Sequence, residues 1–311
     1  MKDLFSPLGK RQRARRANSR GRKLSEKGEN AAAIEEYQRA ITLDPTWSAP
    51  FYNLGLLRKY RSEWQASLDA NLRATELAPK DEAGWWNLGI AATALGRWDL
   101  ARRAWRGAGL DVPEGEGPLD MPCGFTPIRL DPEGAAETVW SQRLDPARAR
   151  LSNIPLASYC YGDVVLNDGA AVGYRKSEGE DVPVFNCLAL LEPSSLSTWC
   201  VEIELDVGRV APVDVAFGEL ERLAQERGLA AEDWSRSVRL LCRACSEGVP
   251  HERHDTDQAE ESAAAPTPAG KAHRVAIAAH TRGEVNDLLE DWQPARFGAQ
   301  LGAIEIEFSH A

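Results

Sequence analysis

The sequence predicts a multidomain α + β chain that begins with an α-solenoid and continues with strand-rich domains. Residues 14–113 repeat with a period of 34, which is typical of stacked helical hairpins. From about residue 122, apolar residues alternate with a period of two, which is typical of strands. Beyond residue 195 the order strand–helix–strand occurs twice, which predicts a four-stranded α + β domain.

The repeats are clearest at an aromatic–Leu–Gly motif. Residues 85–89 read Trp-Trp-Asn-Leu-Gly, and residues 51–55, which lie 34 positions earlier, read Phe-Tyr-Asn-Leu-Gly. The small and helix-ending residues keep the same spacing: Ala40, Ala74, Ala108, Pro45, Pro79 and Pro113. A turn signal inside each unit predicts two antiparallel helices, and glycine lets them cross closely. The pattern resembles the tetratricopeptide repeat (TPR), which implies three such repeats that together form a binding scaffold.

In the TPR family the first helices of the units line a concave groove, so the resemblance implies a set of groove residues. They are Tyr52, Asn53, Leu56, Tyr60, Trp86, Asn87 and Ile90, with Asn18 and Arg22 from the first unit. Asn53 and Asn87 match asparagines that, in this family, hydrogen-bond the main chain of an extended peptide. Ala83 stands where the carboxylate-clamp variant has a lysine. We therefore expect an aromatic-rich groove for an apolar or mixed segment of a protein partner.

Aromatic residues of the repeats are expected in two roles. Trp85, Trp98 and Trp105 occupy the apolar positions of the repeat and should lie in the core. Tyr52 and Trp86 should be exposed anchors for a ligand. After the last repeat, residues 114–118 have a linker composition and not a helical one, so the array lacks a capping helix. We expect the following domain to pack on this end.

The first 23 residues are basic, although the whole chain is acidic. They hold nine Lys or Arg and one Asp, and because the 311-residue chain has a net charge of −10, the rest carries about −18. The basic stretch could be an arm that contacts nucleic-acid phosphates. We favour a solvated first helix of the array, because Ala14, Ala17 and Gly21 keep the small positions of the repeat. In a third interpretation, the arm docks on the acidic body of its own or a neighbouring chain.

The middle segment is predicted to be a small antiparallel sheet or a half-open barrel. Its strand patterns cover residues 139–144, 161–166, 171–175 and 184–191. Asn-Asp-Gly at residues 167–169 predicts a tight turn, and residues 177–181 predict a looser one. Asp163, with Arg143 and Arg175 nearby, could belong to a site, but a turn or pairing carboxylate is the favoured interpretation.

The C-terminal segment is predicted to have the ferredoxin-like order of elements. Strand patterns cover residues 197–205, 237–241, 274–279 and 303–308, and helical patterns lie around residues 217–224 and 285–292. Residues 257–268 are polar and rich in Ala and Pro, which predicts a mobile loop. The combination of repeats and this segment resembles bacterial TPR proteins whose C-terminal half has no assigned activity, and the resemblance supplies no catalytic residues.

A possible zinc site lies between the second and third of these strands. Cys242, Cys245, His251 and His254 have the spacing C-x2-C-x5-H-x2-H. Two thiolates and two imidazoles can complete a tetrahedral Zn²⁺ site, and four protein ligands leave no open position, so the ion would be structural. A redox dithiol and unrelated surface thiols are the alternatives.

The predicted domains are an N-terminal basic arm, the repeats, a linker, a small β domain and the ferredoxin-like domain with the zinc knuckle. Their ranges are 1–13, 14–113, 114–121, 122–192 and 193–311. The leading hypothesis is a non-enzymatic adaptor that binds a partner protein's segment in the groove. The alternatives are a nucleic-acid-binding protein that uses the arm and the knuckle, and an enzyme with an unmarked site in the C-terminal half. We find no phosphate-binding glycine loop and no nucleophile elbow.

The remaining features favour a cytoplasmic protein. No run of residues is long and apolar enough to span a membrane, and no apolar signal segment is present, so no membrane association is expected. The six cysteines form no dense framework, which favours reduced thiols.

Overall fold

The computed structural model describes residues 7–121, 123–134, 136–177, 179–205, 212–236 and 272–310. The chain divides into two compact units. The repeat unit comprises Met1–Pro122 with Leu144–Ala147, and the β-rich unit comprises Cys123–Arg143 and Arg148–Ala311.

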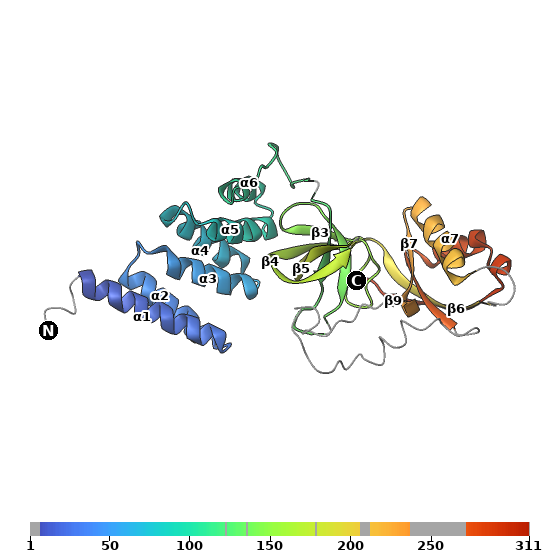
Figure 1. Cartoon of the computed structure of the whole chain (residues 1–311), viewed down its shortest axis with the longest axis horizontal. Helices are drawn as coiled ribbons and strands as arrows, with labels where there is room; N and C mark the ends of the chain where they lie inside the picture. Colours follow the sequence, from blue (N-terminus) through green and yellow to red (C-terminus); the bar gives the residue numbers. More distant parts are fainter. Residues whose placement is uncertain are drawn as a thin grey trace. The chain divides into compact units, whose positions relative to one another are not determined.

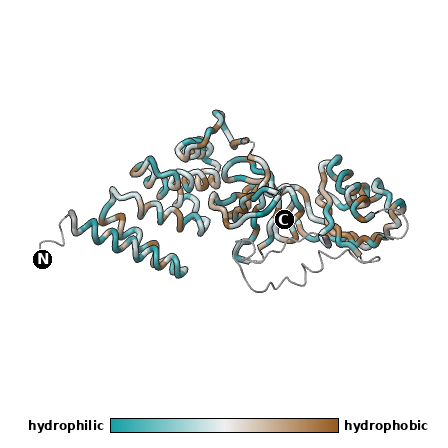
Figure 2. Tube along the Cα trace, viewed as in Figure 1, coloured by the Kyte–Doolittle hydropathy of each residue, from teal (hydrophilic) through white to brown (hydrophobic). Residues whose placement is uncertain are grey.

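The repeat unit consists of three helical hairpins (Figure 1), which confirms the predicted solenoid. Its helices are α1 (Pro7–Glu26), α2 (Asn30–Leu43), α3 (Ser48–Tyr60), α4 (Trp64–Leu77), α5 (Glu82–Ala94) and α6 (Trp98–Gly107). The first helix begins at Pro7, so most of the predicted arm is helical and continuous with the first repeat. Ala14, Ala17 and Gly21 are buried, whereas the rest of α1 is strongly hydrophilic (Figure 2). The basic stretch is therefore the polar side of a packed helix.

A glycine in the first helix of each repeat faces a residue 16 positions later in the second helix. A Cβ on Gly89 would lie 2.6 Å from ring carbons of the fully buried Trp105. A Cβ added to Gly21 would lie 2.6 Å from the Tyr37 ring, and a Cβ added to Gly55 would lie 2.6 Å from the Asn71 amide. The predicted reason for these glycines, a close helix crossing, is thus confirmed. Only the middle repeat places a polar side chain at the crossing.

Asn71 belongs to a small buried polar network between α3 and α4. Its amide donates to the main-chain oxygen of Ser67 at 2.9 Å, and the Ser67 hydroxyl donates to the main-chain oxygen of Gly55 at 2.8 Å. Both side chains are fully buried, and Asn71 Oδ1 has no partner among the residues that the structure describes. The middle hairpin therefore lacks the aromatic packing of its two neighbours.

The segment after α6 folds back onto that helix through arginine side chains. Arg102, which is 6% exposed, donates from Nε to the carbonyl of Pro113 at 3.3 Å and from Nη1 to the carbonyl of Gly117 at 2.7 Å. Arg106 donates to the carbonyl of Val112 at 3.3 Å. The segment has no helix, as its composition predicts, and its main chain is fixed to the last repeat by these bonds.

The first part of the β-rich unit is a closed five-stranded barrel. Its strands are β1 (Phe125–Arg129), β2 (Thr138–Arg143), β3 (Arg148–Leu151), β4 (Val164–Ser177) and β5 (Glu180–Glu192). Consecutive strands pair antiparallel, and β1 closes the barrel by pairing in parallel with β5. Ile128, Val139, Leu151, Val165 and Phe185 fill the interior. The sequence predicted β2 and β5, but it did not predict β1 or β3.

The predicted turn at residues 167–169 is wrong. β4 runs through it without a break, and the pairing with β5 shifts register between Asn167 and Ala171. Asn167 and Asp168 are buried, and the Asp168 carboxylate accepts a hydrogen bond from Gly169 N at 2.7 Å. The pairing of the two long strands therefore outweighs the local turn propensity, and residues 167–169 form an irregularity of the bulge type within β4. The other predicted turn joins β4 and β5, with Ser177 opposite Glu180.

The second part of the β-rich unit has the predicted ferredoxin-like order. Its elements are β6 (Ser197–Leu205), α7 (Val213–Glu226), β7 (Ala230–Asp233), β8 (Ala272–Ala279), α10 (Arg282–Trp292) and β9 (Ala299–Phe308), with short 3-10 helices η2 (Trp234–Arg236) and η3 (Pro294–Phe297). The sheet order is β7-β8-β6-β9, and its strands pair antiparallel. Along the chain, the second strand of this domain is β7. The sequence instead predicted that strand at residues 237–241, which lie outside the described residues.

Both long helices of this domain contribute to one apolar core with the sheet. Phe217 of α7 stacks on Trp292 of α10, and Trp292 stacks on Phe297. The Trp292 indole N–H donates to the carbonyl of Ala216 at 2.8 Å, so the buried ring has its polar atom satisfied. A capping box between Thr281 and Glu284 fixes the start of α10.

Candidate functional site

The candidate site is the surface shared by the first helices of the three repeats. In that surface α3 is a neighbour of both α1 and α5. Asn53 of α3 donates from Nδ2 to Oδ1 of Asn18 on α1 at 2.9 Å. This bond places the two predicted amides side by side.

The Asn18–Asn53 pair keeps unused hydrogen-bonding capacity. An asparagine amide offers two N–H donors and an acceptor oxygen. The bond between them uses one donor of Asn53 and one lone pair of Asn18. Asn18 is 7% exposed, so its amide orientation is fixed before any ligand arrives. One side chain thus presents a free oxygen and the other free N–H groups, which is what an extended main chain needs.

Asn87, at the matching position of the third repeat, differs from Asn53 in its hydrogen bonding. It is 5% exposed and has no hydrogen-bond partner in the described part of the chain. Its neighbour Trp86 meets Trp105 edge-to-face with ring centroids 5.3 Å apart, and the Trp86 indole N–H is also buried without an acceptor among the described residues. Buried polar groups are normally satisfied, so the Trp86 indole N–H requires an explanation. The Asn87 amide atoms are not among the fully buried atoms without a partner, so they keep some contact with solvent.

The apolar groove residues differ in accessibility. Tyr60 is 56% exposed, with the Lys59 ammonium 4.4 Å from the centre of its ring. Tyr52 and Leu56 are partly buried. Ile90 is fully buried, and its burial speaks against a direct contact with a ligand. Trp86 is half-buried against Trp105, so it is less of an exposed anchor than the sequence predicted.

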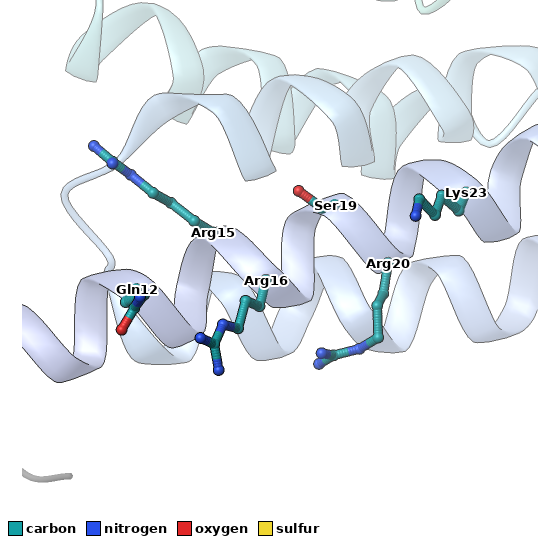
Figure 3. A pocket seen from close by; sticks show the side chains of 6 residues that line it. All are labelled: Gln12, Arg15, Arg16, Ser19, Arg20 and Lys23. Atoms are coloured by element: carbon teal, nitrogen blue, oxygen red, sulfur yellow. The ribbon is translucent and has the colours of Figure 1, made fainter.

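A cavity of about 470 Å³ lies along α1. It is lined by Gln12, Arg15, Arg16, Ser19, Arg20 and Lys23 (Figure 3). Arg20 pairs with Glu36 of α2 at 2.7 Å. Arg15, Arg16 and Lys23 have no ion pair with any residue that the structure describes. The basic composition was visible in the sequence, but its gathering around one cavity was not.

Asp163 is a structural carboxylate. It is fully buried and accepts hydrogen bonds from Cys160 N at 2.8 Å and Ser194 N at 2.7 Å. His310 Nε2 lies 2.9 Å from its oxygens. Neither of the two arginines predicted nearby is among its partners in the described part of the chain. The favoured sequence interpretation, a turn or pairing carboxylate, is therefore the one the geometry supports.

Two buried thiols of the β-rich unit are unsuited to nucleophilic chemistry. Burial raises the pKa of Cys160 to about 11, and burial likewise raises the pKa of Cys187 to about 11. A nucleophilic cysteine requires the opposite shift, because the thiolate is the reactive form. These residues therefore act as small apolar side chains.

The predicted zinc ligands Cys242, Cys245, His251 and His254 lie outside the described residues, as does the predicted loop at 257–268. Within the described ranges, no group of three or more His, Cys, Asp or Glu side chains could hold a metal ion. No described helix has the length and apolar character needed to cross a bilayer.

The repeat unit defines its class as a helical-hairpin solenoid, whose function resides in an extended surface. Residues 21–59 match the family model described as "TPR repeat", which agrees with the three helical hairpins and with their 34-residue period.

Solved structures with similar repeats include the second TPR of Spaghetti (RPAP3) bound to the HSP90 peptide SRMEEVD. It is 22% identical with a TM-score of 0.32, over 33% of this chain and 94% of that chain. The Arabidopsis OM64 TPR domain is 18% identical with a TM-score of 0.31, over 32% of this chain and 83% of its own. MamA is 26% identical with a TM-score of 0.29, over 30% of this chain and 56% of its own. No curated protein matches the chain.

Proposed function

We propose that this protein is a non-enzymatic adaptor that holds an extended segment of a partner protein against the first helices of its repeats. The observation that carries the proposal is the unused hydrogen-bonding capacity of the groove asparagines. The Asn18–Asn53 pair has free donors and a free acceptor, and the nearly buried Asn87 has no partner among the described residues. Main-chain groups of an extended peptide offer donors and acceptors that would satisfy all three amides.

Selectivity would come from the side chains beside the amides. The exposed ring of Tyr60 and the partly buried Tyr52 and Leu56 offer apolar contact to every second residue of an extended segment. Rigid aromatic side chains lose little conformational entropy on binding, which makes them effective contacts. The ligand is therefore a segment with apolar residues at alternate positions.

The β-rich unit supports this role as a second surface or a rigid body. Its neighbouring strands β6 and β9 carry exposed carboxylates at Glu202, Glu204, Glu305 and Glu307, which disfavour contact with nucleic-acid phosphates. A structural Zn²⁺ on Cys242, Cys245, His251 and His254, with spacing that fits a tetrahedral site, would support the same body. A cytoplasmic location agrees with free thiols of this kind.

The groove is tested by selecting 12-residue peptides from a random phage-displayed library on the immobilised full chain. Labelled peptides are then measured by fluorescence anisotropy against Asn53→Ala, Asn87→Ala and the control Gln38→Ala, which changes an exposed residue of α2. We expect each asparagine variant to bind about tenfold more weakly, or ~1.4 kcal/mol, and the control to bind as the unmodified chain does. Peptide affinities that are independent of both asparagines would refute the proposal.

A further inference from the structure

Strand β9 leaves one edge of the C-terminal sheet open. The sheet order β7-β8-β6-β9 gives two edge strands, of which β7 has four mostly buried residues and β9 has ten residues. β9 pairs with β6 on one side and with no described strand on the other. In an antiparallel sheet every second residue of an edge strand points its N–H and C=O outward, so about five residues of β9 offer both groups to a further strand.

β9 lacks most of the features that normally protect an open edge. Exposed edge strands are usually short, covered, or marked by lysine or proline, because their free main-chain groups invite pairing with other chains. β9 contains neither lysine nor proline, and seven of its ten residues are exposed. Its pairing with β6 shifts register twice, and such irregularities twist a strand without covering it. The edge is therefore accessible to a strand from another chain.

On the helix side of the sheet, β9 presents an apolar row beside a pocket. The pocket has a volume of about 300 Å³ and is lined by residues of α10, η3 and β9, namely Asn286, Leu289, Glu290, Pro294, Leu301 and Ile304. Leu301 and Ile304 are three positions apart, and a shift in the pairing with β6 between them brings both to this side. Ile306 lies opposite Trp199, which packs on the same core, so Ile306 extends the row, and it is 55% exposed.

The other face of the same edge is acidic. The Arg274 guanidinium of β8 lies 3.1 Å from the Cys200 sulfur of β6 and 2.6 Å from the Glu307 carboxylate of β9, so these side chains share one face. The preceding residue, His273, meets Phe217 of α7, so this shared face is the one away from the helices. Strand pairing adds the residues opposite Arg274 and Cys200 and the next alternate position of β6. Four exposed carboxylates therefore gather on this face: Glu202, Glu204, Glu305 and Glu307.

We propose that β9 is a docking edge for an extended segment of a partner protein in which Lys or Arg alternates with apolar residues. The segment pairs with β9 as a fifth strand of the sheet. Its apolar side chains cover Leu301, Ile304 and Ile306, and its cations meet the carboxylates of the opposite face. Because successive residues of a strand point to opposite faces, one alternating sequence satisfies both sides at once. This docking edge is separate from the groove of the repeats and does not depend on it.

Charge favours such a segment over β9 of a second copy. A second copy brings its own Glu305 and Glu307 to the acidic face, and like charges on neighbouring strands destabilise a sheet. Lys or Arg on the added strand instead lies beside opposite charge, and cross-strand pairs of opposite charge stabilise a sheet. The occupant is therefore a basic, alternating segment of another protein.

The probe is the fluorescein-labelled peptide Lys-Val-Arg-Val-Lys-Val-Arg-Val, whose binding to the full chain is measured by fluorescence anisotropy. One comparison peptide has the same composition with the cations and the valines in separate blocks, and another has Glu in place of each cation. We expect the alternating basic peptide to bind at least about tenfold more tightly than either, with an affinity that falls as salt rises. Amide hydrogen exchange of β9 should slow in the complex, because an added strand protects its outward N–H groups.

A charge introduced into the apolar row tests the strand pairing. Ile306→Lys changes an exposed residue of the edge, and the matched control Val215→Lys changes an apolar residue of α7 that is 54% exposed. We expect Ile306→Lys to bind the alternating probe about tenfold more weakly and the control to bind it as the unmodified chain does. The groove variant Asn53→Ala/Asn87→Ala should also leave this affinity unchanged.

Neutral substitutions on the opposite face test the charge pairing. Glu202→Gln/Glu305→Gln removes two exposed charges of the acidic face. The matched control Glu133→Gln/Glu180→Gln removes two exposed charges of the barrel. We expect the first variant to bind the probe about tenfold more weakly, with a smaller salt dependence, and the control to keep both properties.

The outcomes are decisive in either direction. Equal affinity of the alternating and block peptides would overturn the proposal, because it would show attraction of charge without strand pairing. Unchanged affinity in Ile306→Lys, unchanged exchange in β9, or no binding of the probe would overturn it as well. A chain that sediments as a dimer and becomes a monomer in Ile306→Lys would reassign the edge to a second copy. An unchanged urea midpoint verifies the folding of each variant, and the peptide comparison on the unmodified chain decides the question even where a variant unfolds.

Discussion

Replacing the two matched asparagines by leucine should change stability in opposite directions. In Asn87→Leu, a nearly buried amide without a partner among the described residues gives way to an apolar side chain of similar size. A fully buried unsatisfied polar group costs about 1–3 kcal/mol, and the Asn87 amide, whose atoms keep some solvent contact, lies below the top of this range. Part of the gain is lost to imperfect packing of the new side chain, so we expect a net stabilisation of about 1 kcal/mol.

Asn53→Leu removes the 2.9 Å bond to Asn18, whose side chain is 7% exposed and then has no partner from α3. The same principle predicts a loss of about 1–2 kcal/mol. With a urea dependence of about 2 kcal/mol per molar, the midpoints should rise by about 0.5 M for Asn87→Leu and fall by about 0.5–1 M for Asn53→Leu.

The assay is urea unfolding of the full chain followed by far-ultraviolet circular dichroism at the helical band, because the helices lie mainly in the repeats. Both variants should also bind a groove peptide more weakly, so Asn87→Leu would trade function for stability. If Asn87→Leu lowers the midpoint as much as Asn53→Leu does, Asn87 has a structural role and the argument from its missing partner is wrong.

Other variants test the packing, the thiols and the metal. Gly89→Ala should destabilise the repeats by about 1–3 kcal/mol in thermal unfolding, because the new Cβ meets the buried Trp105 ring. By contrast, a Cβ at Gly218 of α7 meets nothing within 4 Å, so Gly218→Ala should stabilise its helix by about 0.5–1 kcal/mol. Burial raises the pKa of the Cys160 and Cys187 thiols from 9.0 to about 11. The unfolded chain therefore loses these protons first, and urea stability should be full below pH 9 and should fall as the pH rises toward 11; a flat profile would contradict the shift. Elemental analysis should find about one zinc per chain, and much less in Cys242→Ser; less than about half an equivalent in the unmodified chain would count against the site.

The sequence was most informative where a steric requirement recurs. The glycine at the helix crossing appears in all three repeats because a Cβ cannot fit there, so the period was visible without coordinates. The groove asparagines were assigned from the family resemblance, at matching positions of the second and third repeats. Asn53 has a partner, whereas Asn87 has none among the residues that the structure describes. This difference could not be predicted, since it depends on how neighbouring side chains meet across helices.

Short or irregular strands were the least predictable elements. β3 and β7 have four residues each, too few to show alternation. β3 also carries the buried Arg148, which reads as a surface residue. The Asn-Asp-Gly motif at residues 167–169 has strong turn propensity, but pairing with β5 on both sides of the motif decides its conformation. Tertiary pairing is not encoded in any local window of the chain.

The polar crossing in the middle repeat has a consequence for how the array opens. Solenoids normally fray from their ends, where one neighbour is missing. Here the outer hairpins are closed by Tyr37 and Trp105, whereas the middle one relies on Asn71 and Ser67. Amide hydrogen exchange should therefore be comparatively fast in α3 and α4. A peptide that spans from α1 to α5 would cross this weak centre, so its binding should slow exchange there more than at the ends.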